Sequence, residues 1–139
     1  MNAKIYTPHK ERDKRISSAV TAIIAILPLD LYSPHKKELL STCIWKITEA
    51  DGKFKVRYWS EGALIAPAKN LRHEHVFERK ELIERLMSGE SVASVISDAI
   101  ACIVTKDEHD LLSASAQSGW NRYHDCQIGV FDTQEQEWL

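Results

Sequence analysis

Residues 53–60, KFKVRYWS, decide the fold class of this 139-residue chain. Aromatic and β-branched side chains occupy every second position of this stretch, at Phe54, Val56 and Tyr58. A period of two with these residue types predicts a β-strand over 54–60. A second short strand is predicted at 128–131. Pairing the two gives a small antiparallel sheet packed against helices.

Helical patterns dominate the rest of the sequence. Apolar residues recur at three- and four-residue steps in four segments, at 16–27, 39–47, 77–87 and 92–103. Shorter helices are predicted at 106–113 and 120–126, and a short strand is possible at 63–66. The expected fold is therefore α+β and mostly helical, with four or more helices. The predicted core comprises Ile23, Ile24, Ile44, Leu82, Leu86, Ile96, Ile100 and Ile103.

Length and charge predict one ordinary domain. Residues 1–9 are expected to be a loose N-terminal lead-in, and residues 10–139 a single globular domain. The chain has 18 Lys plus Arg against 20 Asp plus Glu, so its formal net charge is −2. A surface that grips DNA is usually clearly basic, so the overall charge favours a protein partner over nucleic acid.

Cysteine usage and hydrophobic runs predict a cytoplasmic protein. Three widely spaced cysteines include no CxxC pair, which argues against a zinc ribbon. The longest apolar run, at 19–31, is too short and too interrupted to span a bilayer. No cleavable leader pattern follows it, so we expect no membrane association.

Two short segments carry half of the six histidines. They are residues 72–76, with His73, Glu74 and His75, and residues 105–110, with His109. Imidazole and carboxylate groups together can bind a metal or move a proton near neutral pH. In the second segment, Thr105 and Glu108 have the spacing of a helix capping box.

The first of these segments, Glu74-His75-Val76, resembles the acidic-His-apolar opening of the HNH nuclease motif. The resemblance implies that His75 would activate water, while Glu74 or His73 would hold one divalent metal ion together with His109. The chain departs from the motif at 77–103, where two helical stripes replace a loop and a strand. The alternative is that His73 and His75 are polar groups at the start of a helix, with His109 exposed on another.

A second group of residues has the composition of a binding surface. Arginine and large aromatic residues, which are enriched in binding hot spots, occur at Arg57, Trp59, Trp120, Arg122 and Tyr123. The alternative is that these side chains pack the strand and the last helix into the core.

Two functional hypotheses remain. The first is a small cytoplasmic protein-binding module without a cofactor, acting as a regulator or inhibitor of a larger bacterial or phage assembly. The second is an HNH-like, metal-dependent hydrolase of nucleic acids that uses one divalent metal ion. The sequence leaves the oligomeric state open.

Overall fold

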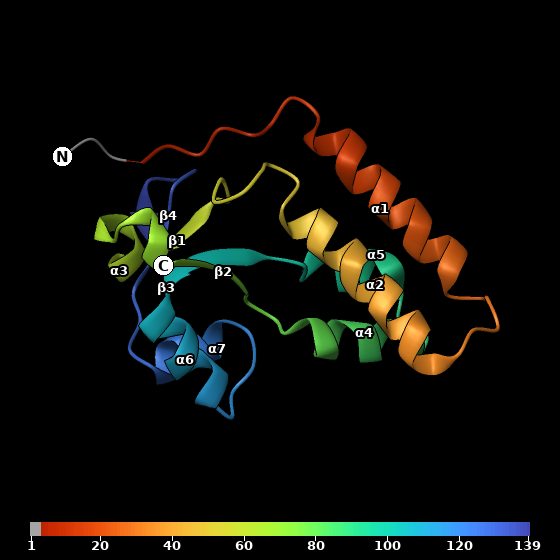
Figure 1. Ribbon diagram of the computed structural model, residues 1–139. Helices are drawn as coiled ribbons and strands as arrows, with labels where there is room; N and C mark the ends of the chain where they lie inside the picture. The colour runs from red at the N-terminus through yellow and green to blue at the C-terminus, as the bar shows by residue number, and fades with distance from the viewer. Residues whose placement is uncertain (1–3) are drawn as a thin grey trace.

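A computed structural model describes residues 4–139, and within them seven α-helices and five short strands form an α+β fold (Figure 1). The elements follow the order α1 (Arg12–Ile26), α2 (Ser33–Thr48), β1 (Tyr58–Ser60), α3 (Glu61–Ile65), a 3-10 turn (Ala68–Asn70), β2 (Leu71–His75), α4 (Arg79–Met87), α5 (Val92–Ser97), β3 (Ala101–Thr105), α6 (Lys106–Ala114), α7 (Trp120–Asp125), β4 (Val130–Asp132) and β5 (Glu137–Trp138). The predicted mostly helical α+β class is confirmed.

The sheet has the strand order β2-β3-β1-β4-β5. Strands β1 and β3 run parallel, with Tyr58 beside Cys102, and all other neighbours are antiparallel. The predicted pairing of 54–60 with 128–131 is confirmed for its second half, in the antiparallel pair β1–β4, because β1 covers only Tyr58–Ser60 and Phe54 has a positive φ of 55° that no strand accommodates. The sheet is mixed rather than purely antiparallel because β3, which the sequence did not predict, lies between β1 and β2.

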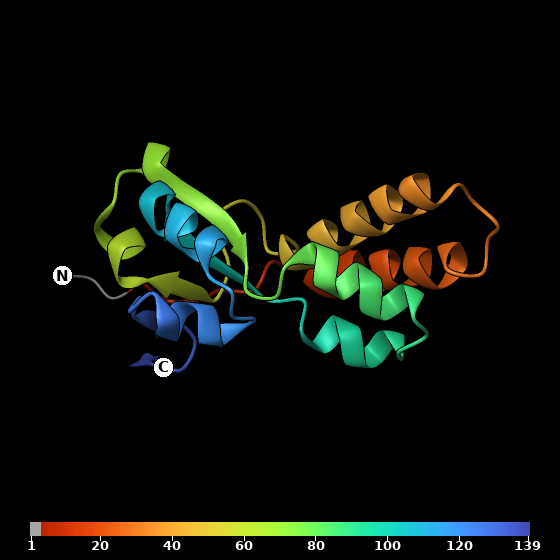
Figure 2. The ribbon, with the colours of Figure 1, turned by 90° about the horizontal axis from the view of Figure 1, so that it is seen from below.

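Four helices gather at one end of the molecule, and the sheet with α3, α6 and α7 occupies the other (Figure 2). Helix α1 contacts α2, α2 contacts α4, α4 contacts α5, and α5 returns to α1. These helices enclose one apolar core, which comprises Ala19, Ile23, Leu40, Ile44, Ile47, Leu82, Ile83, Leu86 and Val95. Burial of this apolar surface is the main force that holds the four helices together.

Each face of the sheet has its own helical cover. Helices α6 and α7 pack through Leu112 and Tyr123 against Cys102 and Val104 of β3. Helix α3 packs through Ala63 against Ile103 on the opposite face. Because successive residues of a strand point to opposite faces, the four apolar residues at 101–104 serve both covers.

Three segments differ from the predictions. The predicted helix over 92–103 ends at Ser97, and residues 101–105 form β3. The possible strand at 63–66 is helix α3. The histidine segment 73–75, expected at a helix start, lies in strand β2, while the following helix begins at Arg79.

Burial tests the predicted core directly. Ile23, Ile44, Leu82, Leu86 and Ile103 are buried as predicted, whereas Ile96 and Ile100 are only half-buried. The prediction for Ile24 was wrong, because its side chain is 56% exposed. Adjacent helical residues point about 100° apart, so Ile23 faces the core and Ile24 does not.

Across residues 4–139, none of the helices combines the length and the apolar character that a bilayer crossing requires.

Candidate functional site

Strand β2 contains the histidines of the first histidine segment and contacts helix α6, which carries His109. His73 and His75 pair with Ile103 and Ala101, while Glu74 between them pairs with Cys102. The two histidines therefore share one face of the sheet and the glutamate points to the other. The strand separates the residues that the HNH resemblance would place around one metal ion.

The two histidines meet helix α2 through one hydroxyl group. The Oγ1 atom of Thr48 lies 2.8 Å from Nε2 of His75 and 3.0 Å from Nε2 of His73. A hydroxyl has a single proton, so at least one imidazole must donate its own Nε2 proton to Thr48. The ring of Trp45 lies against both imidazoles, at centroid distances of 4.7 and 5.1 Å. This cluster joins the helical end of the molecule to the sheet.

Burial keeps these two histidines neutral. It lowers the pKa of His73 to about 4 and that of His75 to about 3. For His75, the neighbouring His73 and the guanidinium groups of Arg79 and Arg122 lower the pKa further. His75 is only 7% exposed, whereas the general-base role requires open access to the water that it activates.

On the opposite face of β2, the buried carboxylate of Glu74 contacts two side chains. One of its oxygens lies against Nδ1 of His109 on α6, and the other lies 3.3 Å from Nη2 of Arg122 on α7. Helix α6 starts directly after β3 and packs back over β2, which carries His109 to this carboxylate. The structure thus brings Glu74 and His109 together, and places His73 and His75 elsewhere.

Arg122 is the most buried charged side chain near Glu74, at 1% exposure. Its Nη2 group donates to the carbonyl oxygens of His75 at 2.6 Å and Val76 at 2.8 Å. A fixed guanidinium therefore already supplies the positive charge beside Glu74. A divalent cation on the same carboxylate would face this charge at short range in a poorly solvated site.

The donor set around Glu74 does not fit a metal centre. Within residues 4–139, no group of three or more His, Cys, Asp or Glu side chains is arranged to hold a metal ion. Glu74 and His109 supply two such groups on their face of β2, and the other carboxylate oxygen of Glu74 lies beside Arg122. The arrangement is that of a buried ion-pair cluster.

The predicted capping box is formed at the start of α6. Thr105 Oγ1 accepts from the Glu108 amide at 3.1 Å, and Glu108 Oε1 accepts from the Thr105 amide at 2.8 Å. The same Glu108 oxygen also accepts from the hydroxyl of Ser60 at 2.5 Å. Glu108 thereby connects α6 to the end of β1.

The five residues predicted as a binding surface do not share one face. Trp59 is buried on the α3 side of the sheet, while Arg122 and Tyr123 are buried on the α6–α7 side. Trp120 is half-buried against Tyr58. Arg57 forms a bidentate ion pair with Asp132, which lowers the pKa of that carboxyl group to about 2. Their aromatic and guanidinium groups therefore pack elements together.

Many of the exposed apolar residues lie elsewhere, around the connection between α1 and α2. Five of the eleven exposed large hydrophobic side chains within residues 4–139 fall between positions 24 and 39, and we refer to them as the hairpin tip: Ile24, Leu29, Leu31, Tyr32 and Leu39. A signal for this surface is present in the sequence, because LPLDLY at 27–32 is apolar yet follows the end of a helical stripe.

Comparison with protein-family models, with curated proteins and with solved structures found no match for the chain.

Proposed function

We propose that this protein is a small protein-binding module whose contact surface is the hairpin tip. The observation that carries the proposal is the gathering of exposed apolar side chains at one end of the α1–α2 hairpin. Contiguous exposed apolar surface marks interaction sites in proteins that otherwise bury such groups. The tip lies at the far end of the helical half from the sheet (Figure 1), so a partner can reach it without touching the sheet.

The chemistry of the tip suits a protein partner. Tyr32 is 69% exposed and its ring rests edge-on against His35, with 4.9 Å between ring centroids. A tyrosine held in one orientation loses little conformational freedom on binding, which is why tyrosine is enriched in hot spots. Leu29 and Leu31 beside it offer apolar contact area.

A module of this size would regulate or inhibit a larger assembly by occupying a site on it. The proposal places this action in the cytoplasm, where the free cysteines Cys43, Cys102 and Cys126 stay reduced.

Site-specific photocrosslinking tests the proposal. A photoreactive phenylalanine analogue would replace Leu31, and in a control it would replace Leu111 on α6, which is more exposed, at 55% against 37% for Leu31. In cells that express the protein from its own gene, we expect discrete adducts from position 31 only. The adducts should disappear when Leu29 and Tyr32 are changed to serine. Equal adducts from both positions, or none from position 31, would contradict the proposal.

A metal-dependent hydrolase is the second candidate, and one observation favours it. Two antiparallel strands, β2 and β3, are followed directly by helix α6, and Glu74 meets His109 across them. This is the order of elements that the HNH resemblance implies. The position of Arg122 and the burial of His75 weigh against it.

Metal titration separates the two candidates. We expect that Mg²⁺, Mn²⁺, Ni²⁺ and Zn²⁺ produce no cleavage of single- or double-stranded nucleic acid. Metal-dependent cleavage that is lost in both Glu74→Gln and His109→Ala would favour the hydrolase. The Lys106→Ala variant, changed on the exposed side of the same helix, is the matched control.

A further inference from the structure

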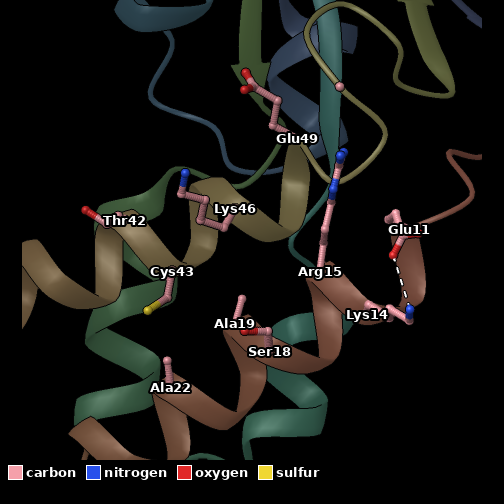
Figure 3. Close-up of a pocket in the computed structure, with 11 residues that line it drawn as sticks. Glu11, Lys14, Arg15, Ser18, Ala19, Ala22, Thr42, Cys43, Lys46 and Glu49 are labelled. Atoms are coloured by element: carbon pink, nitrogen blue, oxygen red, sulfur yellow. Dashed lines mark ion pairs between the residues drawn. The ribbon is translucent and has the colours of Figure 1, made fainter.

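A groove runs along the outer side of the α1–α2 hairpin (Figure 3). It has a cavity volume of about 710 Å³ and is open to solvent along its length. Small side chains of α1, at Ser18, Ala19 and Ala22, face Cys43 of α2 across its floor. We call this surface the α1–α2 groove. Its inner side is the core of the four helices, so the groove is the hairpin's uncovered face.

One end of the groove is positively charged. Arg15 of α1 and Lys46 of α2 stand on its two sides (Figure 3). Neither forms an ion pair within the described part of the chain, and Arg15 donates only to the carbonyl of Ala50. Two acids lie nearby: Glu11 pairs with Lys14, and Glu49 accepts a hydrogen bond from the neutral indole of Trp45. Three cations, Lys14, Arg15 and Lys46, therefore face two carboxylates in the lining, and the groove keeps a net positive charge for a ligand to neutralise.

The other end of the groove leads to the hairpin tip. Leu39 of the tip precedes Cys43 by four residues on α2, so their side chains follow one another on the same helical face. Leu39 is exposed and Cys43 is half-buried. The apolar strip therefore continues from the tip into the groove and ends at the two cations.

The walls of the groove favour a helical ligand. Both are continuous α-helices whose backbone groups bond within the helix, so they offer nothing to the backbone of an extended peptide. A helical segment satisfies its own backbone hydrogen bonds. Small side chains on the floor also permit the 8–10 Å approach typical of packed helices.

Resting on the proposed function, we propose that the α1–α2 groove binds an acidic amphipathic helix of the partner protein. Apolar side chains of that helix lie over Ala19, Ala22 and Cys43, and its carboxylates lie beside Arg15 and Lys46. The two-helix hairpin then becomes a three-helix contact, with the tip as its apolar end.

Selection from a displayed library of single-helix peptides tests this inference. Peptides with randomised surface positions would be selected on the full-length protein, and their affinities measured by fluorescence anisotropy. We expect the recovered peptides to share an apolar stripe at i, i+3, i+4 and i+7, with Asp or Glu at one end. Reversing both charges, in Arg15→Glu/Lys46→Glu, should weaken binding about tenfold or more at low salt, and less at high salt.

Matched variants separate the groove from general effects. Ala22→Gln places a longer side chain on the floor and should abolish binding, whereas Ala114→Gln on exposed α6 should not. Lys69→Glu is the charge control on the sheet half. All variants should show wild-type circular dichroism, and only the variant with Arg15→Glu, which loses the hydrogen bond to the Ala50 carbonyl, should have a lower melting temperature.

Three results would overturn the inference: recovered peptides without an acidic end, equal binding by the charge-reversed variant, or a self-associated wild type that Lys46→Glu makes monomeric. The last would identify a second copy as the occupant. If groove binding holds while crosslinking at the tip fails, the proposed contact surface is wrong but the groove inference stands. If crosslinking at the tip succeeds while groove binding fails, the proposed protein-binding module stands and the helical ligand of the groove is rejected.

Discussion

At the scale of single residues, Arg122 determines the charge balance around the buried carboxylate of Glu74. Its guanidinium is almost fully buried and bonds one carboxylate and two backbone carbonyls. Its Nε and Nη1 groups have no hydrogen-bond partner among residues 4–139, although Nη1 lies 3.5 Å from a carboxylate oxygen of Glu78. Such a side chain stabilises the fold only as long as its partners remain, because an unpaired buried charge is strongly unfavourable.

Removing Arg122 should therefore be more harmful than removing the whole ion pair. We expect Arg122→Met to lower the free energy of unfolding by roughly 3–5 kcal/mol, since it leaves the Glu74 carboxylate buried without its guanidinium. The double variant Arg122→Met/Glu74→Leu should be more stable than Arg122→Met alone. Urea denaturation with a coincident second probe measures both. Additive losses in the double variant would show that the two charges are not coupled.

The cap of α6 is a second prediction at this scale. Thr105→Ala should lower the free energy of unfolding by roughly 0.5–2 kcal/mol, because the Glu108 amide loses its acceptor. Glu108→Ala should cost at least as much, because the same carboxylate also accepts from Ser60. Thermal melts of both variants check the order, with Asp107→Ala in the same exposed helical turn as the control. A Glu108 variant that is more stable than Thr105→Ala would mean that the Ser60 bond contributes nothing.

At the scale of elements, the joint between α2 and β2 depends on two uncharged imidazoles. Both rings contact Thr48, and their centroids are 5.2 Å apart. The groups around them are Trp45 of α2, Glu49 directly after α2, Arg79 of α4 and Arg122 of α7. Glu49 favours a positive charge on His73 and Arg79 opposes one there, whereas at His75 both Arg79 and Arg122 oppose a positive charge.

Acid should therefore weaken this joint. The folded-state pKa values of His73 and His75, about 4 and about 3, lie below the ordinary histidine value of 6.5 because both side chains are buried. Below pH 6.5 the unfolded chain therefore binds more protons than the folded chain. The contribution of the two histidines to the free energy of unfolding is fully present above pH 6.5 and is lost as the pH falls towards 4 and 3. Each histidine contributes a slope of at most about 1.4 kcal/mol per pH unit.

Unfolding free energies measured by urea denaturation between pH 7.5 and 4 test this dependence. The double variant His73→Gln/His75→Gln should have a flatter profile over this range, even if its stability at pH 7.5 is lower. The exposed His124→Gln variant should keep the wild-type slope. An unchanged slope in the double variant would assign the acid sensitivity to other groups.

At the scale of the whole molecule, the sequence predicted the helical half better than the sheet half. Helices α1, α2 and α4 each bury one stripe, so their period of 3.6 is visible. Strand β3 buries all four residues of 101–104, and a continuous apolar run has no period that separates a strand from the end of a helix. Residues 92–103 therefore matched a helical stripe throughout.

The candidate site was predictable only in part, for a related reason. Spacing along α6 placed His109 correctly near a helix start, and the capping box followed from two residues. The contact of His109 with Glu74 depends on the packing of α6 over β2, which local patterns do not encode. A period of two through His73 and His75 was present, but both faces of β2 are covered and neither shows as apolar.

Burial in the helical core gives a prediction for the whole fold. Ile44→Ala should lower the free energy of unfolding by roughly 2–5 kcal/mol, because this side chain is completely buried between helices. Ile24→Ala should cost less than about 1 kcal/mol, because the side chain lies on the exposed hairpin tip. Denaturant melts of both variants decide whether the hairpin packs as described. Similar losses in the two variants would mean that α1 is rotated about its axis.

The chain segment that carries helices α4 and α5 begins at the end of β2 and finishes at the start of β3, where the two strands lie side by side. His75 pairs with Ala101, and the Val76 amide donates to the Ile100 carbonyl at 2.9 Å. Strands β2 and β3 therefore form an antiparallel hairpin in which helices α4 and α5 take the place of a tight turn. The entropic cost of closing a loop rises only with the logarithm of the loop length. Replacing a four-residue turn with residues 76–100 therefore adds roughly 1–2 kcal/mol to that cost. The junction between the end of β2 and the start of β3 is therefore a place where the chain can lengthen or shorten over evolution while the register of the sheet is kept.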